Sequence, residues 1–198
     1  SLDEFEGRIF VGLVAFTMKG VRPYRWLPPF PTARDFGEIN LRTYVHLDGA
    51  EPGVWFFSLE AARLPGVLIG RTLWGLGYRW ARMTLEREGA RRRYRSTRRW
   101  PGPKPALVDI GCEVEGTPAP AEPGTLEHFL VERYVLYTQA RGRLWRGRVH
   151  HAPYLVQPAR LLRCEESLLA AAGLTRGEPL PPLFSAGVDV EVFAVEAV

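Results

Sequence analysis

Residues 38–47, EINLRTYVHL, alternate strictly between two sets of side chains. Successive side chains of a strand point to opposite faces, so an extended segment separates the two sets, whereas a helix would mix them. This segment therefore predicts a sheet that buries one of its faces on a core. The mainly apolar side carries Ile39, Leu41, Thr43, Val45 and Leu47, and the polar side carries Glu38, Asn40, Arg42, Tyr44 and His46.

Short extended segments recur along the rest of the chain, separated by glycine and proline at frequent intervals. We expect about nine strands. Helical spacing indicates two or three helices, which follow Pro65, Thr125 and Cys164. The sequence therefore predicts an α+β, mostly β fold with an antiparallel barrel-like or sandwich core. A length of 198 residues is typical of a single domain over 1–198.

Composition narrows the classes of protein and site. No apolar run approaches the roughly 20 residues of a membrane span, and the first residues, SLDEFEGRIF, lack a secretory pattern. We therefore expect a cytoplasmic protein with no membrane partner. Cys112 and Cys164 match no CxxC or zinc-ligand spacing, which favours buried thiols. We expect no metal and no cofactor, and the oligomeric state stays open.

Arginine is concentrated in residues 82–99, which hold eight arginines and two glutamates. The segment predicts a hairpin that turns at residues 88–90. Such a row is typical of a solvated, charge-protected edge strand. It also fits a nucleic-acid surface on which Trp74, Tyr78 and Trp80 stack against bases. We favour the solvated edge and keep a nucleic-acid-binding module as the alternative.

The polar side of residues 38–47 has two interpretations. An ordinary sheet with one wet face explains it, and the periodicity alone favours this reading. In a closed barrel the same row would line a lumen that holds one small ligand. Asn40, Arg42 and Tyr44 are then candidate ligand-binding residues. The sequence has no GxSxG, HExxH, Walker A or GxGxxG pattern, so the common nucleophile, metalloprotease and nucleotide motifs are absent.

Four segments together resemble the bacterial YqjF-like family, whose members have no established activity. They are INLRTYV, GVWFFSLEAARL, PGTLEHFLVERYVLYT and HHAPYLVQPA, spread over residues 39–159. That family is in turn distantly similar to acetoacetate decarboxylase, which implies a closed or nearly closed barrel-like core around a small-molecule cavity. Family members usually begin with a longer N-terminal segment. The resemblance therefore implies that this chain lacks such a segment.

The similarity to the decarboxylase implies a set of catalytic candidates. In that enzyme, a segment beginning Arg-x-Leu leads to a Pro-Lys-Lys sequence whose first lysine forms a Schiff base. Here Gly77, Tyr78 and Arg79 occupy those positions, so the nucleophilic lysine is missing. GEINLRTYV resembles the strand that carries the enzyme's active-site glutamate, which places Glu38 there. The resemblance implies Glu38, Tyr78 and Arg79 as an acid, a phenol and an anion clamp for a carboxylate or carbonyl ligand.

Three functions remain open at this point. The first is a small-molecule pocket for an anionic or carbonyl ligand, and the sequence does not decide between an enzyme and a binding protein. The second is the nucleic-acid-binding module on residues 82–99. The third is a structural or interaction protein whose cavity is filled by its own aromatic side chains. We expect the first, because the resemblance in fold favours a small-molecule cavity.

Overall fold

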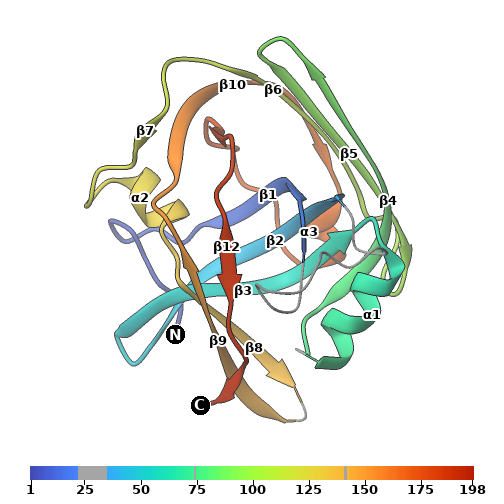
Figure 1. Cartoon of the computed structure of the whole chain (residues 1–198), viewed down its shortest axis with the longest axis vertical. Coiled ribbons are helices and arrows are strands. Elements are labelled where there is room, and N and C mark those ends of the chain that lie inside the picture. Colours follow the sequence, from blue (N-terminus) through green and yellow to red (C-terminus); the bar gives the residue numbers. More distant parts are fainter. Residues whose placement is uncertain (22–34, 74, 141) are drawn as a thin grey trace.

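The computed structural model describes residues 1–21, 35–73, 75–140 and 142–198. The described residues form thirteen strands and three helices, which confirms a mostly β fold (Figure 1). The helices are α1 (Leu64–Leu73), α2 (Leu126–Val131) and α3 (Leu168–Ala171). The strands are β1 (Val11–Met18), β2 (Phe36–Leu47), β3 (Ala50–Ala61), β4 (Tyr78–Glu88), β5 (Arg91–Trp100), β6 (Leu107–Val114), β7 (Ala119–Pro120), β8 (Val135–Ala140), β9 (Arg143–His151), β10 (Leu155–Glu166), β11 (Leu183–Ser185), β12 (Val190–Val192) and β13 (Glu196–Ala197).

The strands form one mixed sheet, with the order β11-β10-β6-β5-β4-β3-β8-β9-β12 along its main path. β2 lies between β1 and β3, and both of these pairings are antiparallel. Among the described strands, no pairing joins the ends of the path, so the sheet is open. The core therefore differs from the expected antiparallel barrel-like or sandwich core in two respects: the sheet is mixed, and it is open.

β3 is the reason that the sheet is mixed. One edge of β3 pairs with β2, and the other pairs in parallel with two different strands. Residues 59–61 lie beside the start of β4, and residues 54–55 lie beside β8. The chain leaves β3 through α1 before it enters β4, and a helical crossover of this kind returns the chain in the same direction. The sequence pattern indicated the helix but not the parallel pairing.

Both faces of β2 are buried, although its alternation predicts one wet face. On one face, Ile39 and Leu41 pack in a core that includes Leu168 of α3. On the other face, Glu38 is 3% exposed and Tyr44 is 2% exposed. This polar face is covered because Leu126, Phe129 and Leu130 of α2 pack against the core cluster that contains Tyr44. In addition, Val67 of α1 belongs to the same buried cluster as Ala61, the partner of Glu38 on β3.

Local signals fix several element ends. Thr125 caps α2, since its hydroxyl oxygen accepts a hydrogen bond from the backbone N–H of His128. β4 and β5 form the hairpin expected within residues 82–99.

The proline-rich residues 22–34 and the hairpin position Arg141 lie outside the described residues. Of the described helices, none has the length and apolar character needed to cross a membrane.

Candidate acid–phenol site

Glu38 and Tyr78 meet on the covered face of the sheet. Glu38 lies near the start of β2, and Tyr78 is the first residue of β4. The Tyr78 hydroxyl donates a hydrogen bond to Oε2 of Glu38 at a donor–acceptor distance of 3.3 Å. The structure therefore brings together two of the three catalytic candidates, from positions forty residues apart in the sequence.

The strand register explains how the two side chains reach each other across β3. Glu38 is paired with Ala61 of β3, and Leu59 is paired with Tyr78. Ala61 is fully buried, and its small methyl leaves space between the carboxyl and the phenol. Gly70 of α1 provides the other condition. A Cβ atom at Gly70 would lie 2.4 Å from Cδ2 of Tyr78, so only glycine lets α1 lie on the phenol ring.

Burial controls the proton affinity of both groups. It raises the pKa of the Glu38 carboxyl from 4.5 to about 8, against the smaller lowering effect of the hydrogen bond from Tyr78. Burial also raises the pKa of the Tyr78 hydroxyl well above its ordinary value, and the charge and hydrogen bond of Glu38 raise it further. At neutral pH the pair is therefore chiefly a neutral carboxylic acid beside a neutral phenol.

This result changes the role expected for Tyr78. A guanidinium beside the phenol, as the adjacent Arg79 suggests, would make Tyr78 ionise more easily than a free phenol. The neighbour of the hydroxyl is a carboxyl group, so its pKa moves in the opposite direction. Glu38, with a pKa of about 8, is the group that can gain and lose a proton near neutral pH.

A cleft of about 210 Å³ lies beside Glu38 at the start of β2. Glu38 is among its lining residues, so this residue touches both the cleft and the Tyr78 hydroxyl. The wall is mainly apolar with a few polar groups, which is the usual character of a small-ligand site. The other lining residues are Phe16, Thr17, Asp35, Phe36, Gly37, Ile39, Ala62, Met83, Thr84, Leu85, Tyr94 and Arg95.

Arg79 does not join the acid–phenol pair in the described contacts. It follows Tyr78 directly along β4, and adjacent side chains of a strand leave opposite faces. Burial lowers the pKa of the Arg79 guanidinium, and the nearby cations Arg98 and Arg71 lower it further, while Glu60 opposes them. The acid, phenol and anion clamp that the resemblance implied are therefore divided between the two faces of the sheet.

The three ligand-binding candidates lie farther along β2. Arg42 donates a hydrogen bond from Nη2 to the carbonyl oxygen of Leu130 at 2.9 Å, and its guanidinium lies 5.6 Å from the centre of the Tyr44 ring. Tyr44 packs against Phe129, with 5.1 Å between ring centres. These two residues hold α2 in place. Asn40 is buried, and its Oδ1 has no hydrogen-bond partner among the described residues.

The sequence reasoning missed a buried ion pair next to Arg79. Arg98 donates to Glu60 through Nε and Nη2, and the exposed fractions of the two side chains are 3% and 0%. Arg98 belongs to the hairpin that was expected to be solvated, and for this residue that expectation is wrong. A signal was present in residues 54–61, VWFFSLEA, where Glu60 is the single charge in an otherwise apolar strand.

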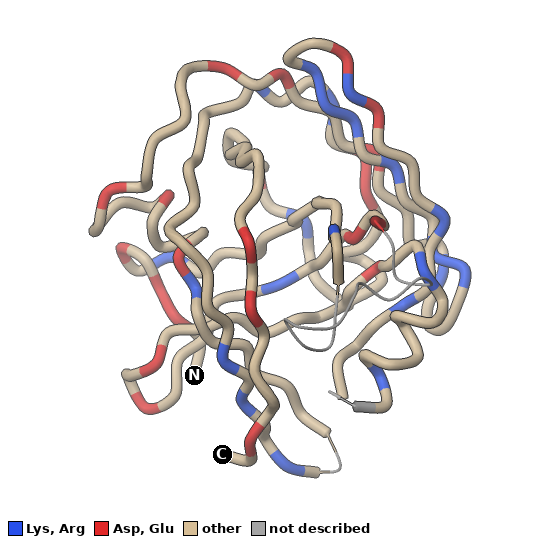
Figure 2. Tube along the Cα trace, in the orientation of Figure 1, with Lys and Arg blue, Asp and Glu red and all other residues tan. Residues whose placement is uncertain are grey.

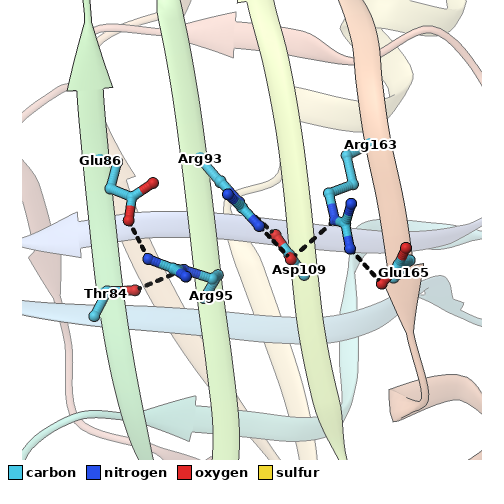
Figure 3. A network of polar contacts seen from close by, with 7 residues as sticks. All are labelled: Thr84, Glu86, Arg93, Arg95, Asp109, Arg163 and Glu165. Carbon is cyan, nitrogen blue, oxygen red and sulfur yellow. Dashed lines mark hydrogen bonds and ion pairs between the residues drawn. The ribbon is translucent and has the colours of Figure 1, made fainter.

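Three of the remaining hairpin arginines, Arg91, Arg93 and Arg95, lie within an ion-pair lattice. Figure 2 shows basic positions along β4 and β5 with acidic positions among them. In Figure 3, Arg93 donates to Asp109, which also accepts from Arg163, and Arg95 pairs with Glu86. Across β4, β5, β6, β10 and the adjoining residue 115, the lattice joins Arg91, Arg93, Arg95, Arg160 and Arg163 to Glu86, Asp109, Glu113, Glu115 and Glu165.

Equal numbers of basic and acidic side chains in this lattice favour the charge-protected strands over a nucleic-acid surface. Phosphate binding requires arginines whose charge is available to the backbone of the nucleic acid. Trp80 and Trp100 are partly exposed beside the lattice. Of the other two aromatic residues of that interpretation, Tyr78 lies under α1 and is not available to stack on a base, and Trp74 lies outside the described residues.

Comparison with known sequences identifies relatives over most of the chain. The model of the DUF2071 family, described as "Uncharacterized conserved protein (COG2071)", matches residues 1–189. The uncharacterized protein YqjF of Bacillus subtilis (strain 168) is 37% identical over 182 residues, which are 92% of this chain and 74% of that protein. The resemblance to the YqjF-like family is confirmed.

Solved structures with the same architecture are enzymes of low sequence identity. Acetoacetate decarboxylase from Legionella pneumophila has a TM-score of 0.55 at 14% identity, over 83% of this chain and 67% of its own. A second acetoacetate decarboxylase structure has a TM-score of 0.57 at 12% identity, over 83% of this chain and 69% of its own. The enduracididine biosynthesis enzyme MppR with HEPES buffer bound has a TM-score of 0.55 at 12% identity, over 85% and 66%. These comparisons confirm the decarboxylase-like fold.

Proposed function

The chain belongs to the DUF2071 family of uncharacterized conserved proteins, and from that premise we propose that it binds a small carbonyl or carboxylate compound in the cleft beside Glu38. In this proposal Glu38 exchanges a proton with the ligand, and Tyr78 supports Glu38. The single observation that carries the proposal is the position of Glu38, which is buried, lines the cleft and accepts a hydrogen bond from Tyr78.

A buried carboxyl group such as Glu38, with no cation beside it among the described residues, is costly to a fold. Within the described residues, the Tyr78 hydroxyl is the one hydrogen-bond partner of the Glu38 side chain. An apolar residue at this position would avoid the desolvation of the ionised form. Perturbed carboxyl groups of this kind cluster at functional sites, where a proton must be gained or lost near neutral pH.

The pair supports a simple proton transfer. Neutral Glu38 donates its proton to an oxygen atom of the bound carbonyl or carboxylate group, and the O–H bond of Glu38 breaks as the new O–H bond forms. The Glu38 carboxylate that remains is stabilised by the hydrogen bond from Tyr78. The reverse transfer restores the acid. Glu38 is thus a general acid in one direction and a general base in the other.

The proposal does not include a Schiff base. The chain contains two lysines, Lys19 and Lys104. Lys19 follows β1 and Lys104 lies in the loop before β6, and both are exposed. Tyr78 occupies the position that the decarboxylase resemblance assigns to the nucleophile, and a phenol cannot form an imine with a carbonyl compound. We therefore propose acid–base or binding chemistry in place of imine chemistry.

Calorimetric screening with small 2-oxo acids, 3-oxo acids and simple carboxylates tests the proposal. We expect at least one compound to bind the wild type with an affinity that falls above about pH 8, because ionised Glu38 repels an anion and cannot donate a proton. Glu38→Gln and Tyr78→Phe should alter that pH dependence. Glu165→Gln, in the ion-pair lattice and outside the cleft lining, is the control and should retain it. Equal binding by the wild type and Glu38→Gln at every pH would refute the role of Glu38.

A further inference from the structure

Three arginines lie near one another around the start of β4, where the side chain of Arg79 leaves the face of the sheet opposite Tyr78. Arg79 is on β4, Arg98 is on β5 and Arg71 is in the last turn of α1. Arg98 and Arg71 are the cations that most affect the pKa of Arg79. The one carboxylate that acts on Arg79 is Glu60, and Arg98 already binds this carboxylate at 2.5 Å. The cluster has three positive charges and one negative charge.

The remaining groups around the cluster do not neutralise this excess charge. Arg98 donates its Nη1 to the carbonyl oxygen of Pro103, and Arg71 donates its Nη1 to the carbonyl oxygen of Tyr78. Both acceptors are uncharged backbone groups. The guanidinium of Arg71 lies 5.8 Å from the ring centre of Trp100. Residues 22–34, Trp74 and Arg141, which lie outside the described structure, include no aspartate or glutamate.

Arg79 also has a donor that is not used. Its Nε is buried and has no hydrogen-bond partner among the described residues. A guanidinium without a full set of acceptors, held near two other cations, is unfavourable in a partly buried site. An anion with several oxygen atoms would satisfy the donor and the charge together, since the guanidinium fork matches carboxylate and phosphate geometry.

Gly102 leaves an approach to the cluster from solvent. It is exposed, and its φ of +108° is a backbone conformation that favours glycine. A Cβ atom at this position would lie 3.3 Å from Cζ of Arg79 and 3.4 Å from Nη1 of Arg98. The bare Cα of Gly102 therefore keeps a side chain away from both guanidinium groups.

We propose that Arg71, Arg79 and Arg98 form a binding site for an oxyanion, a carboxylate or phosphate group of a small molecule, that enters beside Gly102. Arg98 is held by Glu60 and provides a fixed charge. Arg79 and Arg71 provide the donors that the anion engages. Arg79 and Arg98 lie across the sheet from the Glu38 carboxyl and the Tyr78 ring, and none of the three arginines touches that carboxyl in the described contacts, so the site does not depend on the function proposed for the pair.

Calorimetric titration with inorganic phosphate and with acetate, each at an ionic strength matched with sodium chloride, tests the site. We expect saturable binding of one anion by the wild type, and the tighter anion identifies the class of ligand. Arg79→Gln and Arg71→Gln should weaken it by about tenfold or more, because each removes a charge-assisted donor. Arg160→Gln removes an arginine of the ion-pair lattice that does not line the cleft, and this variant should bind as the wild type does.

The wild type and Arg71→Gln keep the test decisive if Arg79→Gln does not fold. Arg98 is left unchanged in every variant, because its removal would strand the buried Glu60 carboxylate. Absence of saturable binding of both anions by the wild type would overturn the proposal. Wild-type affinity in Arg71→Gln, or in folded Arg79→Gln, would also overturn it.

Discussion

Replacing Glu38 with glutamine should make the protein more stable at alkaline pH. The pKa of this carboxyl is raised from 4.5 to about 8, so the folded state holds the proton more tightly than the unfolded chain does. The contribution of this carboxyl to the free energy of unfolding is fully present below the pKa of the unfolded state. It is lost as the pH rises through the pKa of the folded state. At about 1.4 kcal/mol per pH unit, the full effect is roughly 5 kcal/mol.

The measurement is urea unfolding of the wild type and Glu38→Gln, followed by tryptophan fluorescence from about pH 5 to about pH 9. Over that range the raised pKa of Glu38 should widen the difference in unfolding free energy between the two proteins by roughly 4 kcal/mol, in favour of the variant. Glutamine retains an oxygen that accepts from Tyr78, so the hydrogen bond is not the source of the difference.

The control is Glu86→Gln, which replaces a carboxylate in the outer lattice whose side chain is 51% exposed. Its unfolding free energy should follow the wild-type curve at a constant offset. If the curves of Glu38→Gln and the wild type also ran parallel from acid to alkaline pH, Glu38 would not be a buried acid of raised pKa. The reasoning about the site would then be wrong.

Two other predictions follow from the arginines. Glu60→Gln should destabilise the fold by about 3–5 kcal/mol, because Arg98 would remain buried without its carboxylate; a loss below about 1 kcal/mol in urea unfolding would contradict this. The balanced outer lattice should give weak retention on heparin, without a steep loss between about 50 and 200 mM salt. Tight, strongly salt-dependent retention would favour the nucleic-acid alternative.

Local patterns in the sequence were sufficient for the strands and the main hairpins. The alternation of residues 38–47 placed β2, because each side chain of a strand has a fixed face. It did not show that the polar face is covered, because α1 and α2, which cover it, come from later parts of the chain. The parallel pairings of β3 likewise depend on contacts between distant segments, which periodicity does not report.

In the candidate site, too, local patterns predict some features, and contacts between distant segments decide the others. The contact between Glu38 and Tyr78 was expected from the family resemblance, and no local pattern predicts a contact across forty residues. The position of Arg79, in contrast, follows from strand geometry alone. Once Tyr78 and Arg79 are assigned to one strand, they leave opposite faces and cannot both face Glu38. The resemblance grouped them by their order in the sequence.

The short parallel pairing of β3 with β4 explains why two polar sites lie so close together in a mainly apolar region. Leu59 is paired with Tyr78, and Glu60 is paired with Arg79. Leu59 and Tyr78 therefore lie on one face of the sheet, and Glu60 and Arg79 lie on the other face. The face that carries Tyr78 receives the carboxyl of Glu38, and the face that carries Arg79 receives Arg98 through Glu60. The sheet keeps the arginine charges away from the Glu38 carboxyl, and this separation allows the carboxyl to retain its proton near neutral pH.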